Sequence, residues 1–257
     1  MGEGMNSIKK QARVAGFLYL SIALTAPFSL IYVPRTLIVP GDAAATAARI
    51  QASEMLFRFG IGGRIVSATL FAIVVLALYR LLRRVNQTHA VLMVTLALIS
   101  VPLSLLYVIN DIAALVLFRG ADFLSVFDRS QLNALGYLSL RLHSQGTVVA
   151  ELFWGLWLFP FGLLVFRSRF LPRILGVLLI INGFGYVAAS FTGLLLPQHA
   201  YLVSRIVFPA LFGEVAITLW LVIMGAKTQP LDVPASSPGA GGAGDGPRAP
   251  GLRPGCA

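Results

Sequence analysis

Four ionisable residues interrupt long apolar runs of the sequence, and these positions are its best candidates for chemistry: Arg64, Asp111, Glu151 and Glu214. Burying a charge in a bilayer costs about 3 kcal/mol or more unless the charge is paired, hydrated or neutralised, so such residues commonly mark ligand sites or proton pathways. His143 enters the top of one of the same runs. A single histidine at a span border is usually interfacial, but His143 lies near enough to the four charged residues to join them. These five residues form the candidate ligand-binding set.

The four charged residues are expected at a similar depth in the membrane. At about 1.5 Å per residue, Arg64 and Glu151 each lie roughly 24 Å along a helix from the basic turn that follows it. On the same scale Glu214 lies roughly 20 Å from the lysine that ends its run, and Asp111 roughly 31 Å from the start of its run. We therefore predict a shared polar layer in the outer part of the membrane, opening outward.

Charge within this predicted layer does not balance, because three carboxylates accompany one central arginine. Either at least one carboxyl is protonated or an arginine reaches in from the outer rim, for which the candidates are Arg58, Arg119, Arg141 and Arg205. The excess of acid favours a small cationic or polar ligand, or protons, bound by a transporter-like or sensory protein. The alternative is a structural or partner protein, in which each acid pairs with an arginine and only fixes helix packing.

An intramembrane enzyme is a third hypothesis, with Glu151 as a general acid or base acting on a lipid-like substrate. The sequence has no HExxH zinc motif, GxSxG nucleophile elbow, Walker lysine or glycine-rich dinucleotide turn, so no catalytic residue is assigned. The single cysteine, Cys256, excludes an intrachain disulfide and a cysteine-based metal site. The three histidines do not provide a haem or metal pair at matching depth. We expect no metal and no cofactor.

The composition indicates that a membrane bundle positions these residues. Hydrophobic residues make up 57% of the 257-residue chain and charged residues 12%, and the mean hydropathy is +0.83; a water-exposed surface requires more charge. The net charge of +10 is compatible with a nucleic-acid partner. However, the basic residues fall in short groups between apolar runs, as in membrane topology signals. The expected partner is therefore the lipid bilayer and not nucleic acid, and the oligomeric state is left open.

Six apolar runs reach the roughly 20 residues that a helix needs to cross a hydrocarbon core about 30 Å thick. They lie near 14–33, 59–79, 90–117, 143–166, 173–196 and 204–226. Gly41-Asp42 before an alanine-rich stretch, and Asp128 with Gln131 at capping-box spacing, predict short amphipathic helices in the outer loops, at 42–57 and leading into the fourth run. The predicted fold is all-α: a polytopic six-helix transmembrane bundle with short amphipathic helices in its outer loops.

Positive charge in short loops marks the cytoplasmic side of a membrane protein. Four segments are basic: residues 1–13, the turn after the second run, the turn after the fourth run and the start of segment 227–257. They are separated by two runs each, so all four fall on the same side of the membrane. We therefore predict a bacterial cytoplasmic-membrane protein whose transmembrane domain spans 14–226 and whose termini are both cytoplasmic. Residues 227–257 are rich in proline and glycine without a period, which predicts a disordered tail.

Several motifs that combine glycine with aromatic residues resemble a known family. They are Arg13-x-x-Gly16-x-x-Tyr19-Leu20, Glu151-x-x-Trp154-Gly155-x-Trp157-Leu158-x-Pro160-x-Gly162, Phe170-Leu171-Pro172-Arg173-Ile174-Leu175-Gly176 and Gly183-x-Gly185-Tyr186. These motifs resemble the bacterial membrane-protein family catalogued as domain of unknown function 4386, over about residues 10–226. The resemblance implies a multi-pass bacterial membrane protein and supplies no activity.

Overall fold

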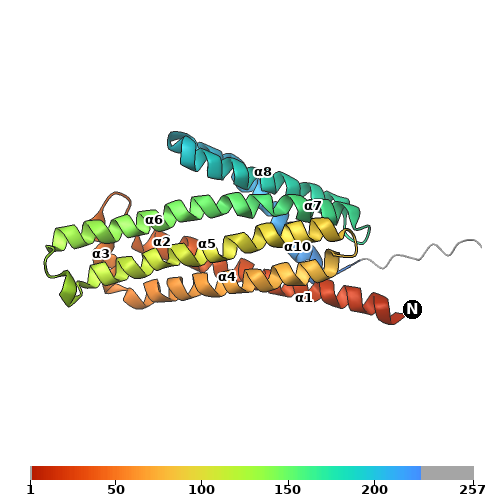
Figure 1. The fold of residues 1–257 in the computed structure, drawn as a ribbon, viewed down its shortest axis with the longest axis horizontal. Helices are drawn as coiled ribbons and strands as arrows, with labels where there is room; N and C mark the ends of the chain where they lie inside the picture. The colour runs from red at the N-terminus through yellow and green to blue at the C-terminus, as the bar shows by residue number, and fades with distance from the viewer. Residues whose placement is uncertain (1, 227–257) are drawn as a thin grey trace, which may run out of the picture.

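The computed structural model describes residues 2–226, which fold into helices joined by short turns, with no strand in this range (Figure 1). Six helices or runs of helices in this range are long and apolar enough to cross a membrane. They are Ile8–Leu37, Glu54–Leu82, Gln87–Arg119, Arg129–Arg167, Arg173–Leu195 and Pro197–Ile223. The predicted all-α, six-helix class is confirmed, and the predicted tail at 227–257 lies outside the described residues.

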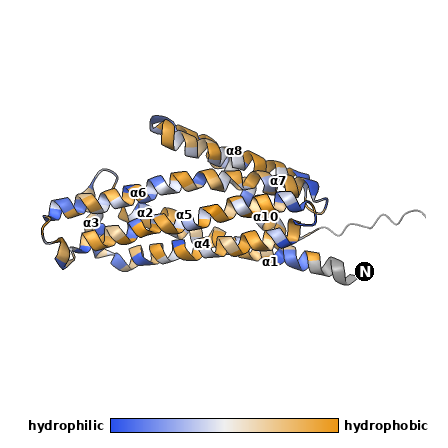
Figure 2. Cartoon of the chain, in the orientation of Figure 1, coloured by the Kyte–Doolittle hydropathy of each residue, from blue (hydrophilic) through white to orange (hydrophobic). Residues whose placement is uncertain are grey.

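Each of these spans consists of one α-helix or of consecutive helices. The α-helices are α1 (Gly2–Pro27), α2 (Val33–Leu37), α3 (Ala43–Ala52), α4 (Glu54–Leu82), α5 (Gln87–Arg119), α6 (Arg129–Leu156), α7 (Leu158–Arg167), α8 (Arg173–Leu195), α9 (Ala200–Val207) and α10 (Phe212–Ile223). A π-helical turn, Phe28–Tyr32, joins α1 to α2, and short 3-10 turns lie at Asp122–Leu124, Pro197–His199 and Phe208–Leu211. Hydrophilic residues gather near the helix ends, and apolar residues dominate between them (Figure 2).

The spans form a closed ring. In chain order α1 packs on α4, α4 on α5, α5 on α6, and α6 with α7 on α8 (Figure 1). The last helix, α10, then packs on both α8 and α1. The first and last spans are therefore neighbours, and the ring encloses an interior that every span can line.

The amphipathic helix predicted before the fourth span is continuous with that span. Asp128 caps its first turn, because Asp128 Oδ1 accepts from the Gln131 N–H at 2.9 Å and Gln131 Oε1 accepts from the Asp128 N–H at 2.9 Å. No proline follows until Pro160, so one helix continues into the bundle. The run Arg129–Arg167 has 39 residues, which at about 1.5 Å per residue is roughly twice the thickness of a hydrocarbon core. Part of this span therefore extends beyond the bilayer.

The helix predicted at 42–57 is divided between α3 and the first turn of α4. Asp42 caps α3 as expected, since its Oδ1 accepts from the Ala45 N–H at 2.8 Å. The chain leaves helical geometry at Ser53, where φ is −131°, and α4 begins at Glu54. α3 packs on α4, α5 and α6.

Prolines explain the irregularities inside the first and fourth spans. Pro160 has no N–H to donate to Leu156 and its ring crowds that carbonyl, so α6 ends at Leu156 and α7 begins two residues later. Pro34 likewise cannot donate to Leu30, and the Val33 N–H instead donates to Phe28 O, five residues back. The first span therefore contains a π-helical turn, a feature that is frequent at functional sites.

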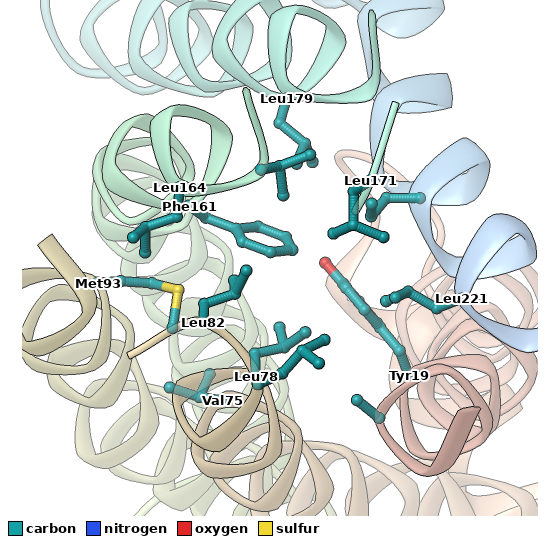
Figure 3. Close-up of a cluster of buried hydrophobic side chains, with 14 of the residues drawn as sticks. Tyr19, Val75, Leu78, Leu82, Met93, Phe161, Leu164, Leu171, Leu179 and Leu221 are labelled. Atoms are coloured by element: carbon teal, nitrogen blue, oxygen red, sulfur yellow. The ribbon is translucent and has the colours of Figure 1, made fainter. Parts of the chain in front are cut away.

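The buried apolar residues form two clusters along the bundle. The first lies toward the basic turns and includes Tyr19, Leu78, Phe161 and Leu221 (Figure 3). The second joins α2 and α3 to the far ends of α4, α5 and α6, through residues such as Ile50 and Phe118. Along α4 and α6 the predicted polar residues fall between these two clusters.

Paired glycines bring α6 and α7 against α8. A Cβ atom at Gly155 would lie 2.7 Å from the Gly183 carbonyl oxygen, and one at Gly162 would lie 2.7 Å from the Gly176 carbonyl oxygen. Neither backbone atom can move without moving its helix, so these positions require glycine. Both pairs belong to the motifs that carry the family resemblance, and their role is close helix packing.

Glycine also allows close helix packing on both sides of α10. A Cβ at Gly16 of α1 would lie 2.7 Å from the Val222 backbone nitrogen, and a Cβ at Gly213 would lie 2.8 Å from the Leu178 carbonyl oxygen of α8. Close backbone contact therefore closes the ring on both sides of its last helix.

Candidate functional site

Arg64, Asp111 and His143 lie together, and we call them the Arg64 cluster. Arg64 Nη1 donates to Asp111 Oδ2 at 2.5 Å, and His143 Nδ1 lies 3.0 Å from the same oxygen. The side chains are only 8%, 2% and 9% exposed. His143 Nδ1 also forms a hydrogen bond with the Tyr107 carbonyl oxygen, at 3.0 Å. Three spans thus contribute to the pairing of one buried carboxylate.

Glu151 has no comparable partner. Its half-buried carboxylate forms no hydrogen bond or ion pair with any residue that the structure describes. It lines a cavity of about 360 Å³ together with the Arg64 cluster, which we call the Glu151 cavity. Ser144 and Thr147 place their side chains on the same wall. The cavity therefore joins a free carboxylate, a paired one and two hydroxyl groups.

Arg64 retains one unused donor. Its Nε atom is buried and has no hydrogen-bond partner among the described residues, although Nη1 is bound to Asp111. The Arg64 side chain lines the Glu151 cavity. A ligand or a water in that cavity could accept this remaining hydrogen bond, because buried N–H groups are rarely left unmatched.

Glu214 lies apart from the other acids and is held by neutral donors. The Tyr19 hydroxyl donates to Glu214 Oε1, and Asn182 Nδ2 donates to Oε2 at 3.0 Å. Tyr186 interacts with the same carboxylate. No lysine, arginine or histidine of the described residues forms an ion pair with it. Glu214 is therefore a hydrogen-bonded carboxyl group without a counter-cation.

A second cavity, of about 180 Å³, lies at Glu214, and we call it the Glu214 cavity. Six aromatic side chains line it: Tyr19, Phe71, Tyr107, Trp154, Trp157 and Tyr186. These residues come from α1, α4, α5, the α6–α7 span and α8, and α10 adds Glu214. All six spans therefore contribute to one cavity wall.

The two cavities adjoin. Leu30, Arg64, His143, Thr147 and Trp154 line both of them and form the partition between them. Leu30 lies in the π-helical turn of the first span, so this irregular turn borders both spaces. The structure thus brings four of the five predicted site residues to one cavity and places Glu214 in the next.

The arginines considered at the outer rim do not reach the intramembrane acids. Arg58 and Arg119 both pair with Glu54, at 2.7 and 2.5 Å. The Arg205 guanidinium lies over the Tyr201 ring at 5.7 Å. Of the three acids in the predicted polar layer, Asp111 is the one that has an arginine partner within residues 2–226.

Tyr19, Asn182 and Tyr186 were not among the predicted site residues, although they contact Glu214 directly. Tyr19 and Tyr186 do belong to the motifs that carry the family resemblance, and a hydroxyl inside an apolar span is itself a polar signal. Asn182 precedes Gly183, and a polar residue beside glycine in a span is also typical of a helix-packing contact. Among the described residues, no three His, Cys, Asp or Glu side chains are placed to hold a metal ion.

Comparison with known proteins identifies relatives without a known activity. A family model described as Domain of unknown function (DUF4386) matches residues 14–225. An uncharacterized protein from Archaeoglobus fulgidus is 32% identical over 171 residues, which cover 66% of this chain and 85% of that protein. No solved structure matches this chain.

Proposed function

The chain belongs to the DUF4386 family, which is defined by sequence and not by an activity, and we propose from its own geometry that it binds a small cationic or polar ligand, or protons, inside the six-helix bundle. The site is the Glu151 cavity, and the protein acts as a transporter-like or sensory membrane protein. The observation that carries this proposal is the free carboxylate of Glu151, which lines a cavity beside the Arg64 cluster.

The alternative of purely structural acids explains only part of this arrangement. Asp111 fits it well, because a buried carboxylate with an arginine and a histidine partner ties together three helices. Glu151 does not fit, since an acid that fixes packing needs a partner and this one has none among the described residues. A carboxylate inside a span without a partner is better explained by a cation or proton that it binds.

The chemistry of the cavity wall supports a ligand with both a positive group and an acceptor. Glu151 supplies the negative charge, and the unused Nε of Arg64 supplies a donor. Ser144 and Thr147 donate to the Leu140 and His143 carbonyl oxygens, which leaves their hydroxyl oxygens free to accept from a ligand. A small amine that also carries an oxygen matches these three groups.

We further propose that the protein resides in a bacterial cytoplasmic membrane with both termini in the cytoplasm. This orientation is supported by the basic turns that join α4 to α5 and α7 to α8, since positive charge in short loops favours the cytoplasmic side. In this orientation the Glu151 cavity lies toward the outer face.

Thermal unfolding of the purified full-length protein in detergent tests the proposal. Ammonium, methylammonium and ethanolammonium chloride are added separately, with sodium chloride as the ionic-strength control. We expect at least one amine to raise the melting temperature of the wild type and to raise it much less in Glu151→Gln. Glu54→Gln is the matched acid-to-amide control, because Glu54 lies outside both cavities, and this variant should respond as the wild type does.

The outcomes separate the hypotheses. If Glu151→Gln responds to the amines like the wild type, the Glu151 site is wrong. If no amine acts, but pH changes the melting temperature of the wild type and not of Glu151→Gln, the site binds protons. If neither amine nor pH distinguishes the two proteins and Glu151→Gln only folds in lower yield, the structural alternative is correct.

A further inference from the structure

We propose that the Glu214 cavity is an aromatic cage for a small alkylammonium cation, such as a quaternary amine with methyl substituents. This inference deepens the proposed function, on which it rests in part, by assigning a ligand class to the second cavity. Its basis is the combination of six aromatic side chains with one carboxyl group that has no cationic partner in the described part of the chain.

The aromatic wall provides the first half of the site. Trp157 is 1% exposed and packs edge-on against Phe71, at a centroid distance of 5.3 Å. Trp154 meets Tyr186 in the same edge-on manner, at 6.1 Å. These contacts hold the rings in place before a ligand arrives. A cation at an aromatic face gains about 2 kcal/mol when the site is desolvated, and quaternary ammonium groups are commonly recognised in this way.

The charges around the cavity provide the second half. Glu214 is oriented by Tyr19 and Asn182 through neutral hydrogen bonds, which position its carboxyl group and supply no positive charge. The cavity wall also contains Arg64 and His143, and the Arg64 charge is already paired with Asp111 at 2.5 Å. A bound cation would therefore supply the partner that Glu214 lacks.

The size of the cavity limits the ligand. Its volume is about 180 Å³, close to the ~150 Å³ of an engineered cavity that accepts benzene. About five to seven non-hydrogen atoms fit such a space, which admits tetramethylammonium or choline and excludes bulky amines. A hard metal cation is less suitable, because it requires about six oxygen ligands and most of this wall is apolar.

Isothermal titration calorimetry on the full-length protein tests this inference with choline and with 3,3-dimethyl-1-butanol, its uncharged analogue of the same shape. We expect choline to bind and the alcohol to bind at least about tenfold more weakly, since only choline gains the cation–π and Glu214 interactions. Glu214→Gln and Trp157→Leu should each weaken choline binding by about tenfold or more. Trp157→Phe should restore part of it, because phenylalanine keeps an aromatic face.

Three results would overturn the inference. They are equal binding of choline and the alcohol, wild-type choline affinity in both Glu214→Gln and Trp157→Leu, and no choline binding to the wild type. If Trp157→Leu does not fold, Phe71→Leu replaces it. If choline does not bind as expected but Glu151→Gln still weakens the rise in melting temperature with amines, the proposed function stands and only the aromatic cage is wrong. If, in addition, the wild type and Glu151→Gln respond to amines alike, both proposals are wrong.

Discussion

Three carboxyl groups inside the spans show how differently one type of residue can be used. Asp111 is paired with Arg64 and His143, Glu214 accepts hydrogen bonds from Tyr19 and Asn182, and Glu151 is left without a partner. Each environment implies a different result of neutralising the acid. We expect removal of the Asp111 charge to lower stability and, under the proposed function, removal of the Glu151 charge to weaken the ligand response.

Replacement of Asp111 by asparagine should strongly destabilise the protein. The substitution leaves the Arg64 guanidinium buried without its counter-charge, and breaking a buried ion pair on one side costs about 3–5 kcal/mol. Chemical denaturation followed by circular dichroism in detergent measures the loss. An unchanged free energy of unfolding would show that water already solvates Arg64.

The double variant Arg64→Met/Asp111→Leu is the control for this prediction. It removes both charges and fills similar space with apolar groups, which is often neutral for a buried pair. We expect the double variant to be more stable than Asp111→Asn alone. A double variant as unstable as the single one would attribute the effect to packing and not to charge.

The sequence was sufficient to identify these residues but not to pair them. Depth along a helix follows from counting residues, so Arg64, Asp111 and Glu151 could all be expected in one layer. The rotation of each helix about its axis determines which acid meets the arginine, and rotation depends on packing with neighbours. Asp111 therefore could not be distinguished from Glu151 before the structure was known.

At the scale of elements, the glycine pairs between α6–α7 and α8 determine how closely the helices approach. Replacing Gly162 with alanine should destabilise the protein by about 1–3 kcal/mol, the usual cost of overpacking. The reason is that the new Cβ would lie 2.7 Å from the Gly176 carbonyl oxygen, which is backbone. The midpoint of thermal unfolding measures the effect.

Gly62→Ala is the matched control for this substitution. Gly62 lies inside α4 with nothing within 4 Å of an added Cβ. Alanine there should be neutral or slightly stabilising, because it is the better helix former by about 1 kcal/mol. Equal destabilisation by the two variants would show that the close contact is not what requires glycine at Gly162.

Short sequence motifs predicted where helices begin better than they predicted where one helix continues into the next. The capping residues Asp42 and Asp128 were recognised from their spacing, because a cap depends only on nearby residues. The same reasoning did not reveal that the helix beginning at Arg129 continues through to the fourth span. An amphipathic segment and a membrane span differ in composition, but the backbone needs no break between them.

At the scale of the whole molecule, the all-α class could be predicted from the composition, but the order of the helices around the ring could not. Apolar helix faces contact lipid and other helices equally well, so hydrophobicity does not select neighbours within a membrane. The small residues do select them. Gly16 marks the face of α1 on which α10 packs, and Gly213 marks the face of α10 that packs on α8, but these partners were identifiable only in three dimensions.

The proposed orientation predicts which end of the bundle faces the outside. Two single-cysteine variants in a Cys256→Ser background test it: Gln87→Cys at the first residue of α5, and Val126→Cys at the opposite end, where the residue is 82% exposed. A membrane-impermeant maleimide added to intact cells should label only Val126→Cys, since the basic turns favour the cytoplasm.

Permeabilised cells provide the control for this labelling, because both variants should then react. Labelling of only Gln87→Cys in intact cells would reverse the orientation. Labelling of both variants before permeabilisation would contradict a chain that crosses the membrane between these positions.

The contact between the first and last spans has a consequence for biogenesis. Tyr19 and Glu214 are separated by 195 positions. The contact between the first and last spans therefore cannot form until nearly the whole chain has been translated. Before α10 is inserted, the faces of α1 and α8 on which it packs, at Gly16 and Leu178, lack their partner helix. The ring of spans therefore closes only with the insertion of α10, the helix that carries Glu214.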